Sequence, residues 1–275
     1  MITRCRPLLG TFVEITAPAE ARMAIDAAFA AVQHVHDRMS FHDERSDLAH
    51  LRHAEPGEIV EVDPETVSVL KLAVALHDAT HGLFEVGVGR ELVRSGFLPR
   101  NGIVRLSRFS GDTSDIAIVD GTHLHCLRPI LIDLGGIAKG HAVDRAVETL
   151  AAQGAEHGLV NAGGDLRMFG DKDWQVQLRD ADHSINQQLI LRNCAVASSA
   201  NRNNRRRYRL KSCGPHYGRD RQAVLIDHRI TVIAESCVIA DAMTKVAMVD
   251  PDLADQLLAP HRGYVLRHRA IADAG

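Results

Sequence analysis

The sequence has few aromatic residues, no paired cysteines and little excess charge. Aromatic side chains make up 4% of the 275 residues, and the five cysteines are scattered without a CxxC pair. This odd, unpaired set argues against a disulfide framework and favours reduced thiols. Because the net charge is only −3, nothing attracts the whole chain to nucleic acid or to an anionic membrane, and any site for a polyanion must be local.

Long apolar runs and the common nucleotide-binding motifs are also missing. No stretch is apolar for long enough to form a transmembrane helix. Residues 1–15 predict neither a signal peptide nor a lipoprotein cleavage site before Cys5. As written, the sequence therefore predicts a cytoplasmic protein, exported only if an upstream signal has been removed. The absence of GxGxxG, GxxxxGK[ST] and HExxH excludes the usual signatures of Rossmann, P-loop and zinc-protease sites.

The periodicity that is present predicts a mixed α+β fold. With 45% hydrophobic residues, the chain can bury a substantial core, and we predict one domain over residues 1–275. An apolar stripe predicts a helix over 21–39, and Asp63 followed by Pro64 predicts the start of a second helix. After residue 115, strands outnumber helices and do not alternate regularly with them, which favours α+β over a doubly wound sheet. Strands are expected near 11–16, 115–126 (a hairpin), 158–170, 174–180, 195–200 and 230–236, and a helix pair near 238–259.

Residues 130–150 carry the first sign of a binding site. ILIDLGGIAKGHAVDRAVETL predicts a buried strand that ends at Asp133, a turn at Gly135 and Gly136, and a helix from about Ile137. Glycines let a ligand approach the backbone, and the first N–H groups of a helix favour an anion. Lys139 adds a point charge suited to phosphate. The alternative is an ordinary tight turn with Lys139 in solvent.

Two other segments suggest that this turn lies in a cleft. NAGGD, residues 161–165, places a second glycine pair beside an amide and a carboxylate at a strand end. In ADAMTK, residues 240–245, helical spacing puts Asp241, Thr244 and Lys245 on one face. The oxygen ligands of Asp241 and Thr244 suit Mg²⁺, which also binds substrate phosphates. The alternative is a surface helix with an Asp241–Lys245 ion pair.

Taken in order, these segments resemble one enzyme family over residues 8 to about 250. They are LLGTFVEI, MSFHDERSDLAHL, HGLFEVGVG, IDLGGIAKGHAVD, NAGGD, AVASS and ITVIAESCVIADAMTK. The chain resembles the ApbE-like FAD:protein FMN transferases, most specifically in IDLGGIAKGHAVD with NAGGD about twenty residues later. The resemblance implies an ApbE-like, T-fold-like mixed sheet with packed helices. It also implies an enzyme that binds FAD and Mg²⁺, transfers FMN to a Ser or Thr hydroxyl of an acceptor flavoprotein, and releases AMP.

The resemblance also implies roles for individual residues. Lys139 and Asp241 would be catalytic, and the metal would be held by the carbonyl of Gly136 together with Asp241 and Thr244. The residues implied in FAD binding are Met39, Ser46, Asp133, Gly135, Gly136, Lys139, Asp144, Asn161, Gly163, Gly164, Asp165 and Ser198.

Several positions depart from the family pattern. Lys245 stands where the family has a threonine metal ligand, so either Thr244 substitutes or Lys245 supplies charge in place of part of the metal shell. The family's FDPT is Phe84–Gly87 here, with the acid Glu85. The histidine of its HxIDPxTG segment is missing from residues 223–227. Two other functions therefore stay open: an FAD pyrophosphatase that produces FMN and AMP, and a non-catalytic FAD-binding protein.

One basic run remains outside these motifs. It consists of Arg202, Arg205, Arg206, Arg207, Arg209 and Lys211. A solvated loop is the simplest interpretation, and a phosphate lid or a docking strip for a partner is the functional alternative. With only Tyr208 interleaved, the run gives no support for nucleic-acid binding.

Overall fold

The computed structural model describes residues 1–180, 184–208 and 211–266. Its strands are β1 Ile2–Leu8, β2 Thr11–Ala17, β3 Ile59–Glu61, β4 Ile116–Ile118, β5 His123–Cys126, β6 Gly158–Ala162, β7 Asp165–Phe169, β8 Trp174–Arg179, β9 Ile185–Leu191, β10 Ala195–Ser199, β11 Arg206–Tyr208, β12 Lys211–Cys213, β13 Ile230–Ala234 and β14 Tyr264–Leu266. Its α-helices are α1 Arg22–Met39, α2 Asp47–His53, α3 Pro64–Ala79, α4 Gly89–Arg94, α5 Ala138–Ala152, α6 Cys237–Ala247 and α7 Pro251–Leu258.

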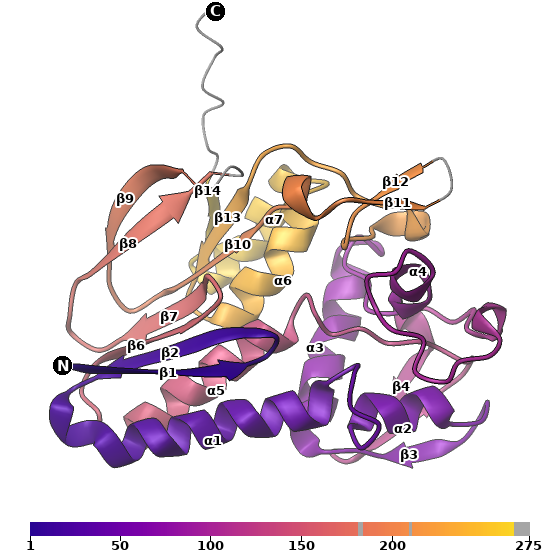
Figure 1. Cartoon of the computed structure of the whole chain (residues 1–275), viewed down its shortest axis with the longest axis horizontal. Helices are drawn as coiled ribbons and strands as arrows, with labels where there is room; N and C mark the ends of the chain where they lie inside the picture. The colour runs from indigo at the N-terminus through magenta and orange to yellow at the C-terminus, as the bar shows by residue number, and fades with distance from the viewer. Residues whose placement is uncertain (181–183, 209–210, 267–275) are drawn as a thin grey trace, which may run out of the picture.

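A seven-stranded antiparallel sheet organises the molecule, with strand order β1-β2-β6-β7-β10-β13-β14 (Figure 1). Because neighbouring strands are antiparallel and no βαβ alternation occurs in this sheet, the predicted mixed α+β class is confirmed. The β6–β7 hairpin pairs Ala162 with Asp165, so Gly163 and Gly164 form its two-residue turn. Their φ angles of +63° and +105° explain why glycine is found at both positions.

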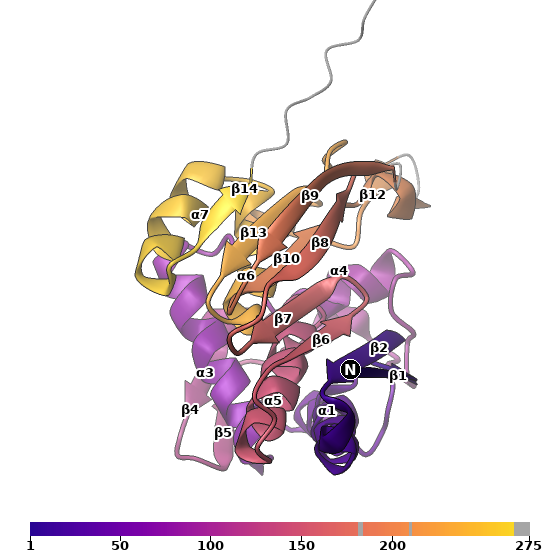
Figure 2. The same ribbon diagram turned by 90° about the vertical axis from the view of Figure 1, so that its left-hand side faces the viewer.

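The two faces of this sheet are covered differently. Helices α1, α5 and α6 pack on one face, where the main hydrophobic core includes Phe29, Val160 and Met243. The β8–β9 hairpin lies over the opposite face, where Met168 and Val176 belong to a second apolar cluster (Figure 2). Strand alternation therefore decides whether a side chain faces the helices or the hairpin.

A smaller sheet, with strand order β3-β5-β4, contains the hairpin predicted over 115–126, with Asp120 and Gly121 between its strands. A local prediction is also confirmed. Asp63 caps α3 by accepting a hydrogen bond from the backbone N–H of Glu65, with Pro64 in the first turn. In the described part of the chain, no helix combines the length and apolar character needed to cross a bilayer.

The strand predicted over 130–133 is wrong. Ile130, Leu131 and Ile132 are buried, but residues 130–133 belong to no sheet. Their backbone instead pairs with the 86–89 loop: the Asp133 N–H donates to the Val86 carbonyl at 2.8 Å, and the Gly89 N–H donates to the Leu131 carbonyl at 2.9 Å. An apolar run predicts burial, but which partner satisfies its backbone depends on the tertiary fold.

Candidate active site

Asp241, on α6, is the centre of a buried polar cluster. Its side chain is 0% exposed. The backbone N–H of Gly140, in the first turn of α5, donates to Oδ2 at 3.1 Å, and Lys245 Nζ donates to Oδ1 at 2.5 Å. Lys139 Nζ lies 3.6 Å from Oδ2. The N-terminus of α5 thus meets a negative charge, as expected, but that charge belongs to the protein's own carboxylate.

Lys139 links this cluster to the glycine turn of the β6–β7 hairpin. Its ammonium forms an ion pair with the carboxylate of Asp165, the residue that follows the turn. Burial by itself lowers the pKa of Lys139, but the negative charges of Asp241 and Asp165 raise it above its ordinary value. Lys139 is therefore charged at neutral pH and held between two carboxylates, not free in solvent.

The pKa values of the two carboxylates shift in opposite directions. Burial raises the pKa of Asp165, and the charge of Asp241 raises it further. Burial also acts on Asp241, but the ammonium groups of Lys139 and Lys245 lower the pKa of Asp241 below its ordinary value. Asp241 is consequently the firmly ionised member of the cluster.

The three residues predicted to hold a metal do meet, but they meet around Lys245. Its Nζ donates to the backbone carbonyl of Asp241 at 3.1 Å and to Thr244 Oγ1 at 3.0 Å, in addition to Asp241 Oδ1. The Lys245 side-chain stem passes over Gly136, where an added Cβ would lie 3.2 Å from Cε. Thr244 is fully buried and donates its hydroxyl proton to the Asp241 carbonyl at 2.7 Å. As arranged here, these residues do not fit a divalent cation, because an ammonium already occupies the ligand oxygens.

A cavity of about 270 Å³ lies beside this cluster and contains several of the predicted cofactor-binding residues. Met39, Asp133, Gly135 and Lys139 all line it, together with Phe41. Burial raises the pKa of Asp133 above its ordinary value. The structure thus brings the end of α1 to the 133–139 turn, although the two segments are almost one hundred residues apart in the sequence.

Two predicted cofactor residues have structural partners instead. Ser46 is fully buried and caps α2, accepting a hydrogen bond from the Ala49 N–H and donating one to the Ser40 carbonyl. Asp144 accepts hydrogen bonds from the first two N–H groups of α6, at Cys237 and Val238, and forms an ion pair with Arg167. Their contact with a cofactor stays a prediction, and the structure explains both residues as helix caps.

The structure also separates Ser198 from the cluster. Ser198 Oγ lies 2.8 Å from Thr231 Oγ1 on the neighbouring strand. Because alternate residues of a strand face opposite sides, Ser199 is the residue that faces α6, with its hydroxyl 2.9 Å from Thr244 Oγ1 and 3.1 Å from Lys245 Nζ. Sequence reasoning missed Ser199, although strand alternation along β10 was the available signal.

Asn161 belongs to the glycine turn and not to the lining of the cavity described above. Its side-chain oxygen accepts a hydrogen bond from the Gly164 N–H at 2.9 Å, and the Gly163 N–H donates to the Phe12 carbonyl at 3.2 Å. These contacts fix the turn against β2. The turn places Asp165 against Lys139.

His216 is a second residue that sequence reasoning missed. It lines a small cavity of about 40 Å³ together with Asp133, Gly136 and Lys245. Its Nδ1 is buried and has no hydrogen-bond partner among the described residues. Burial, assisted by the charge of Lys245, lowers the pKa of His216 to about 3, so the imidazole is neutral at pH 7. Its carbonyl accepts the Val224 N–H at 2.9 Å, which places it beside the segment from which the family histidine is missing.

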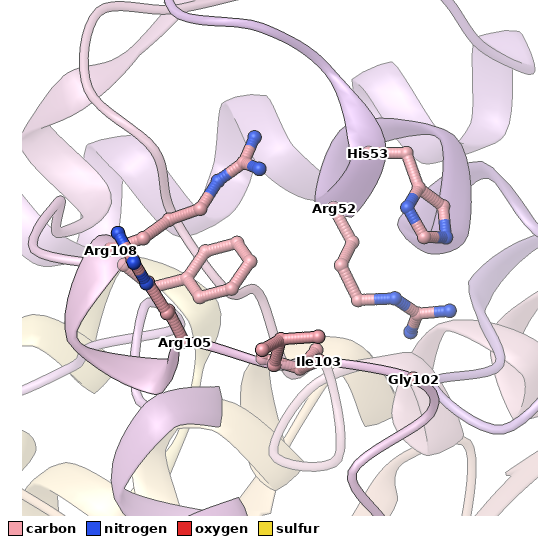
Figure 3. Close-up of a pocket in the computed structure, with 8 residues that line it drawn as sticks. Arg52, His53, Gly102, Ile103, Arg105 and Arg108 are labelled. Carbon is pink, nitrogen blue, oxygen red and sulfur yellow. The ribbon is translucent and has the colours of Figure 1, made fainter.

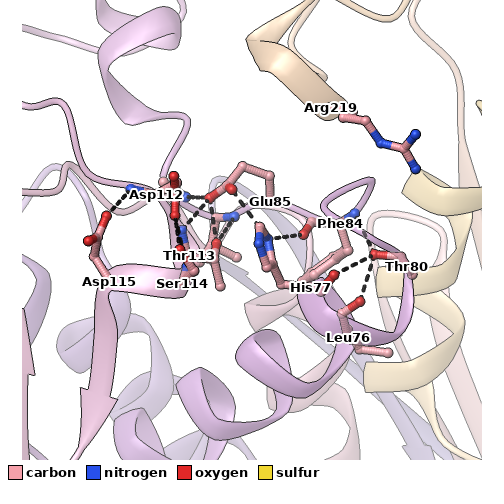
Figure 4. Close-up of polar contacts among 12 residues, drawn as sticks. Leu76, His77, Thr80, Phe84, Glu85, Asp112, Thr113, Ser114, Asp115 and Arg219 are labelled. Atoms are coloured by element: carbon pink, nitrogen blue, oxygen red, sulfur yellow. Dashed lines mark hydrogen bonds and ion pairs between the residues drawn. The ribbon is translucent and has the colours of Figure 1, made fainter.

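Glu85, the acid of the altered FDPT segment, forms a structural clasp (Figure 4). It accepts hydrogen bonds from the N–H groups of Gly87 and Thr113, at 2.5 and 3.0 Å, and lies 3.3 Å from His77 Nδ1. His77, Glu85 and Asp112 present ligand atoms within 4.8 Å of one another. The protein's own hydrogen bonds account for Glu85, so its acidity alone does not indicate a metal.

A larger cavity, of about 490 Å³, lies at a different place and is lined by Arg52, Arg105 and Arg108 (Figure 3). None of the predicted site residues lines it. The Arg52 guanidinium stacks 5.4 Å from the ring centre of Phe41, which also lines the smaller cavity beside Lys139. The stacked pair of Arg52 and Phe41 therefore links the lining of the larger cavity to that of the smaller one.

Part of the basic run is tied down. Arg205 donates to the Ile226 carbonyl at 2.7 Å and pairs with Asp227 at 2.8 Å. Arg206 lies over the ring of Phe97 at 4.7 Å. Arg209 lies outside the described residues. At these two positions the run is anchored to neighbouring segments and is not a freely solvated loop.

Comparison with known proteins identifies a matching family and several similar proteins. The model of the ApbE family matches residues 9–265. A FAD:protein FMN transferase from Vibrio cholerae is 26% identical over 239 residues, which cover 79% of this chain and 70% of the relative. A protein of the same name from Rhodobacter capsulatus is 32% identical over 137 residues, but that match covers only 26% of the relative.

Solved structures extend the comparison to the fold. The ApbE protein from Thermotoga maritima superposes with a TM-score of 0.78 at 26% identity, covering 98% of this chain and 97% of that one. The flavinyl transferase ApbE from Pseudomonas stutzeri superposes with a TM-score of 0.79 at 18% identity, covering 98% and 92%. At the lower identity the likeness establishes the shared fold alone.

Proposed function

The chain belongs to the ApbE family, and we propose that it transfers the FMN moiety of FAD to a Ser or Thr hydroxyl of an acceptor protein and releases AMP. The observation that carries this proposal is the meeting of Lys139, Gly135, Asp133 and Met39 around one cavity. Apolar and aromatic walls suit a flavin or adenine ring, and a fixed ammonium suits its phosphates.

The proposed reaction is a substitution at phosphorus. The acceptor hydroxyl oxygen forms a bond to the phosphorus of the FMN half of FAD, and the bond from that phosphorus to the bridging oxygen breaks. The bridging oxygen leaves with AMP, and the hydroxyl proton passes to a base. Negative charge builds up on the phosphate oxygens and on the leaving group, and a preorganised positive charge stabilises it.

Residues of this chain can provide both the positive charge and the base. Lys139 supplies positive charge at the edge of the cavity, and its two carboxylate partners keep it protonated and in place. The Nδ1 of His216 is buried and has no partner among the described residues, and the negative charge of a bound phosphate would raise the pKa of His216 from about 3, so this nitrogen is placed to accept the hydroxyl proton. We therefore propose His216 as the general base that residues 223–227 do not provide.

Magnesium, which the family resemblance implies, is left out of this mechanism. Its expected ligands on Asp241 and Thr244 contact the ammonium of Lys245, and Gly136 lies against the stem of that side chain. The positive charge in the proposed mechanism comes only from residues of the chain.

Mass spectrometry with an acceptor peptide tests the proposal. The protein is incubated with FAD and a Ser- or Thr-containing flavinylation peptide, and both peptide-bound FMN and free AMP are measured. We expect one FMN on the peptide for each AMP released. AMP with free FMN and no modified peptide would instead identify an FAD pyrophosphatase, and FAD binding without AMP would identify a non-catalytic binding protein.

Ligand titration provides a separate test of the dinucleotide assignment. If both halves of FAD contact the protein, FAD should bind at least tenfold more tightly than FMN or riboflavin, as measured by fluorescence. Equal affinity for the three flavins would contradict the proposal that FAD is the substrate.

A further inference from the structure

We propose that the ammonium of Lys245 is the resident cation of this site and that Asp241 and Thr244 do not bind a divalent metal in this chain. This inference rests on the proposed function for its catalytic meaning, but the cation itself can be tested without the reaction. It assigns to Lys245 the place that the family resemblance gives to Mg²⁺.

The contacts of Lys245 resemble a coordination shell. Four oxygens lie within 3.1 Å of Nζ: Asp241 Oδ1 at 2.5 Å, Thr244 Oγ1 at 3.0 Å, and Ser199 Oγ and the Asp241 carbonyl at 3.1 Å each. An ammonium has three protons to donate, so the four oxygens around it outnumber its protons. A solvent-facing ion pair between residues four apart on a helix would need only the carboxylate contact.

Burial separates this arrangement from an ordinary surface pair. The Asp241 side chain is 0% exposed and that of Lys245 is 15% exposed. Thr244 and Ser199 are also buried. A buried carboxylate requires a matched positive partner, because an unpaired one is costly away from water. Lys245 provides that partner within the same helix.

Each ammonium of the cluster already has a carboxylate partner without a metal. Asp165 and Asp241 provide two carboxylates, and Lys139 and Lys245 provide two ammonium groups in contact with them. Adding a divalent cation would place a double positive charge beside two like charges. The cation would also have to displace Nζ from Asp241 Oδ1, leaving the ammonium without its carboxylate partner.

The distances between Nζ and its oxygen partners also argue against a magnesium ion. Magnesium binds oxygen at about 2.0–2.1 Å and demands near-octahedral geometry. The four oxygens around Nζ are spaced for the longer contacts of an ammonium. Gly136 permits this placement, since its missing side chain leaves room for the Lys245 stem. A metal would need both a tighter cage and a different path for that stem.

Lys245 is also placed to act on a ligand. It lines the 40 Å³ cavity with His216 and Asp133, and Asp133 lines the larger cavity as well. Lys139 and Lys245 thus provide two fixed positive charges, one at each of the two cavities that Asp133 lines. Because both charges belong to the chain, chelation of divalent metal should not remove them.

Calorimetry on the unmodified protein is the first test. Titration with Mg²⁺ and with Mn²⁺ should give no saturable heat, and 5 mM EDTA should leave the melting temperature unchanged. The same titration of His77→Gln controls for the His77–Glu85–Asp112 group. Saturable heat that persists in His77→Gln would overturn the proposal, whereas heat that disappears in it arises at that group and leaves the Asp241 site metal-free, as proposed.

Lys245→Thr supplies the complementary test. It removes the ammonium and restores a hydroxyl four residues after Asp241, so we expect it to gain Mg²⁺ binding and a melting temperature that rises with Mg²⁺. Lys71→Thr, at an exposed position on α3, is the matched control and should behave like the unmodified protein. If Lys245→Thr does not fold, the calorimetry of the unmodified protein still decides the question.

Activity then separates this inference from the proposed function. AMP release by the unmodified protein should change less than twofold on adding EDTA, while Lys245→Thr should lose at least tenfold without Mg²⁺ and regain activity with it. Loss of the unmodified protein's activity in EDTA would overturn the resident cation. Absence of AMP release from both proteins under every condition would reject the transferase proposal, and calorimetry would still decide the cation.

Discussion

Lys139 on α5 and Asp165 on β7 form an ion pair at the edge of the candidate active site, with Asp241 beneath them. The pair joins the first turn of a helix to the residue that follows a glycine hairpin turn. Although the Lys139 side chain is 30% exposed, those of Asp165 and Asp241 are 6% and 0% exposed. Lys139 therefore stabilises two buried carboxylates besides any role it has with a ligand.

Lys139→Met should consequently destabilise the fold. The substitution keeps the apolar stem but leaves Asp165 without its ammonium, and we expect a loss of about 2 kcal/mol in the free energy of unfolding. Urea unfolding measures this loss. In Lys139→Met combined with Asp165→Asn, most of the stability should return, because the buried negative charge is removed as well. If Lys139→Met alone unfolds like the unmodified protein, the ion pair contributes nothing to stability.

Asp144→Asn tests whether that carboxylate is a helix cap or a cofactor contact. It weakens the hydrogen bonds to the first two N–H groups of α6 and removes the charge opposite Arg167. We expect a loss of about 2 kcal/mol in unfolding free energy, with FAD affinity of the folded protein unchanged within twofold. A weaker affinity for FAD at unaltered stability would instead support the cofactor contact implied by the family resemblance.

His216→Gln separates proton transfer from binding. Glutamine keeps a polar side chain of similar reach but cannot act as a base near neutral pH. AMP release should fall on the order of a hundredfold, while FAD affinity stays within about threefold. Stopped assays with chromatographic detection of AMP provide the rate, and fluorescence titration provides the affinity. A full rate in His216→Gln would remove this residue from the reaction.

His77 predicts a pH dependence of stability. The hydrogen bond with Glu85 raises the pKa of His77 above its ordinary value of 6.5. A raised pKa in the folded state means that the folded protein holds this proton more tightly than the unfolded chain. The resulting stabilisation is complete below about pH 6.5 and is lost as the pH rises through the raised pKa.

Melting temperatures between pH 6 and pH 9 measure this contribution. The unmodified protein should lose more stability than Glu85→Gln over that range, since the variant lacks the charge that holds the proton. His77→Gln should show the same shallower profile. Parallel profiles for all three proteins would show that the contact does not influence folding.

The sequence by itself determined the local elements and the residue types of the site. The apolar stripe of α1, the Asp63 cap of α3 and the glycines of the β6–β7 turn depend on residues within a few positions of one another. These features can be predicted without knowledge of the fold, because helical periodicity, capping and positive φ angles are local properties.

Only the tertiary structure decided which groups meet. Residues 130–133 pair with a loop instead of a sheet, Ser199 and not Ser198 faces α6, and His216 enters the cavity beside Lys245. The sequence showed that Asp241 and Lys245 lie on one face of a helix, but it did not show that this face is buried. Burial distinguishes the proposed cation site from a surface ion pair. Packing sets this distinction, because the cost of burying a charge depends on every element that excludes water from it.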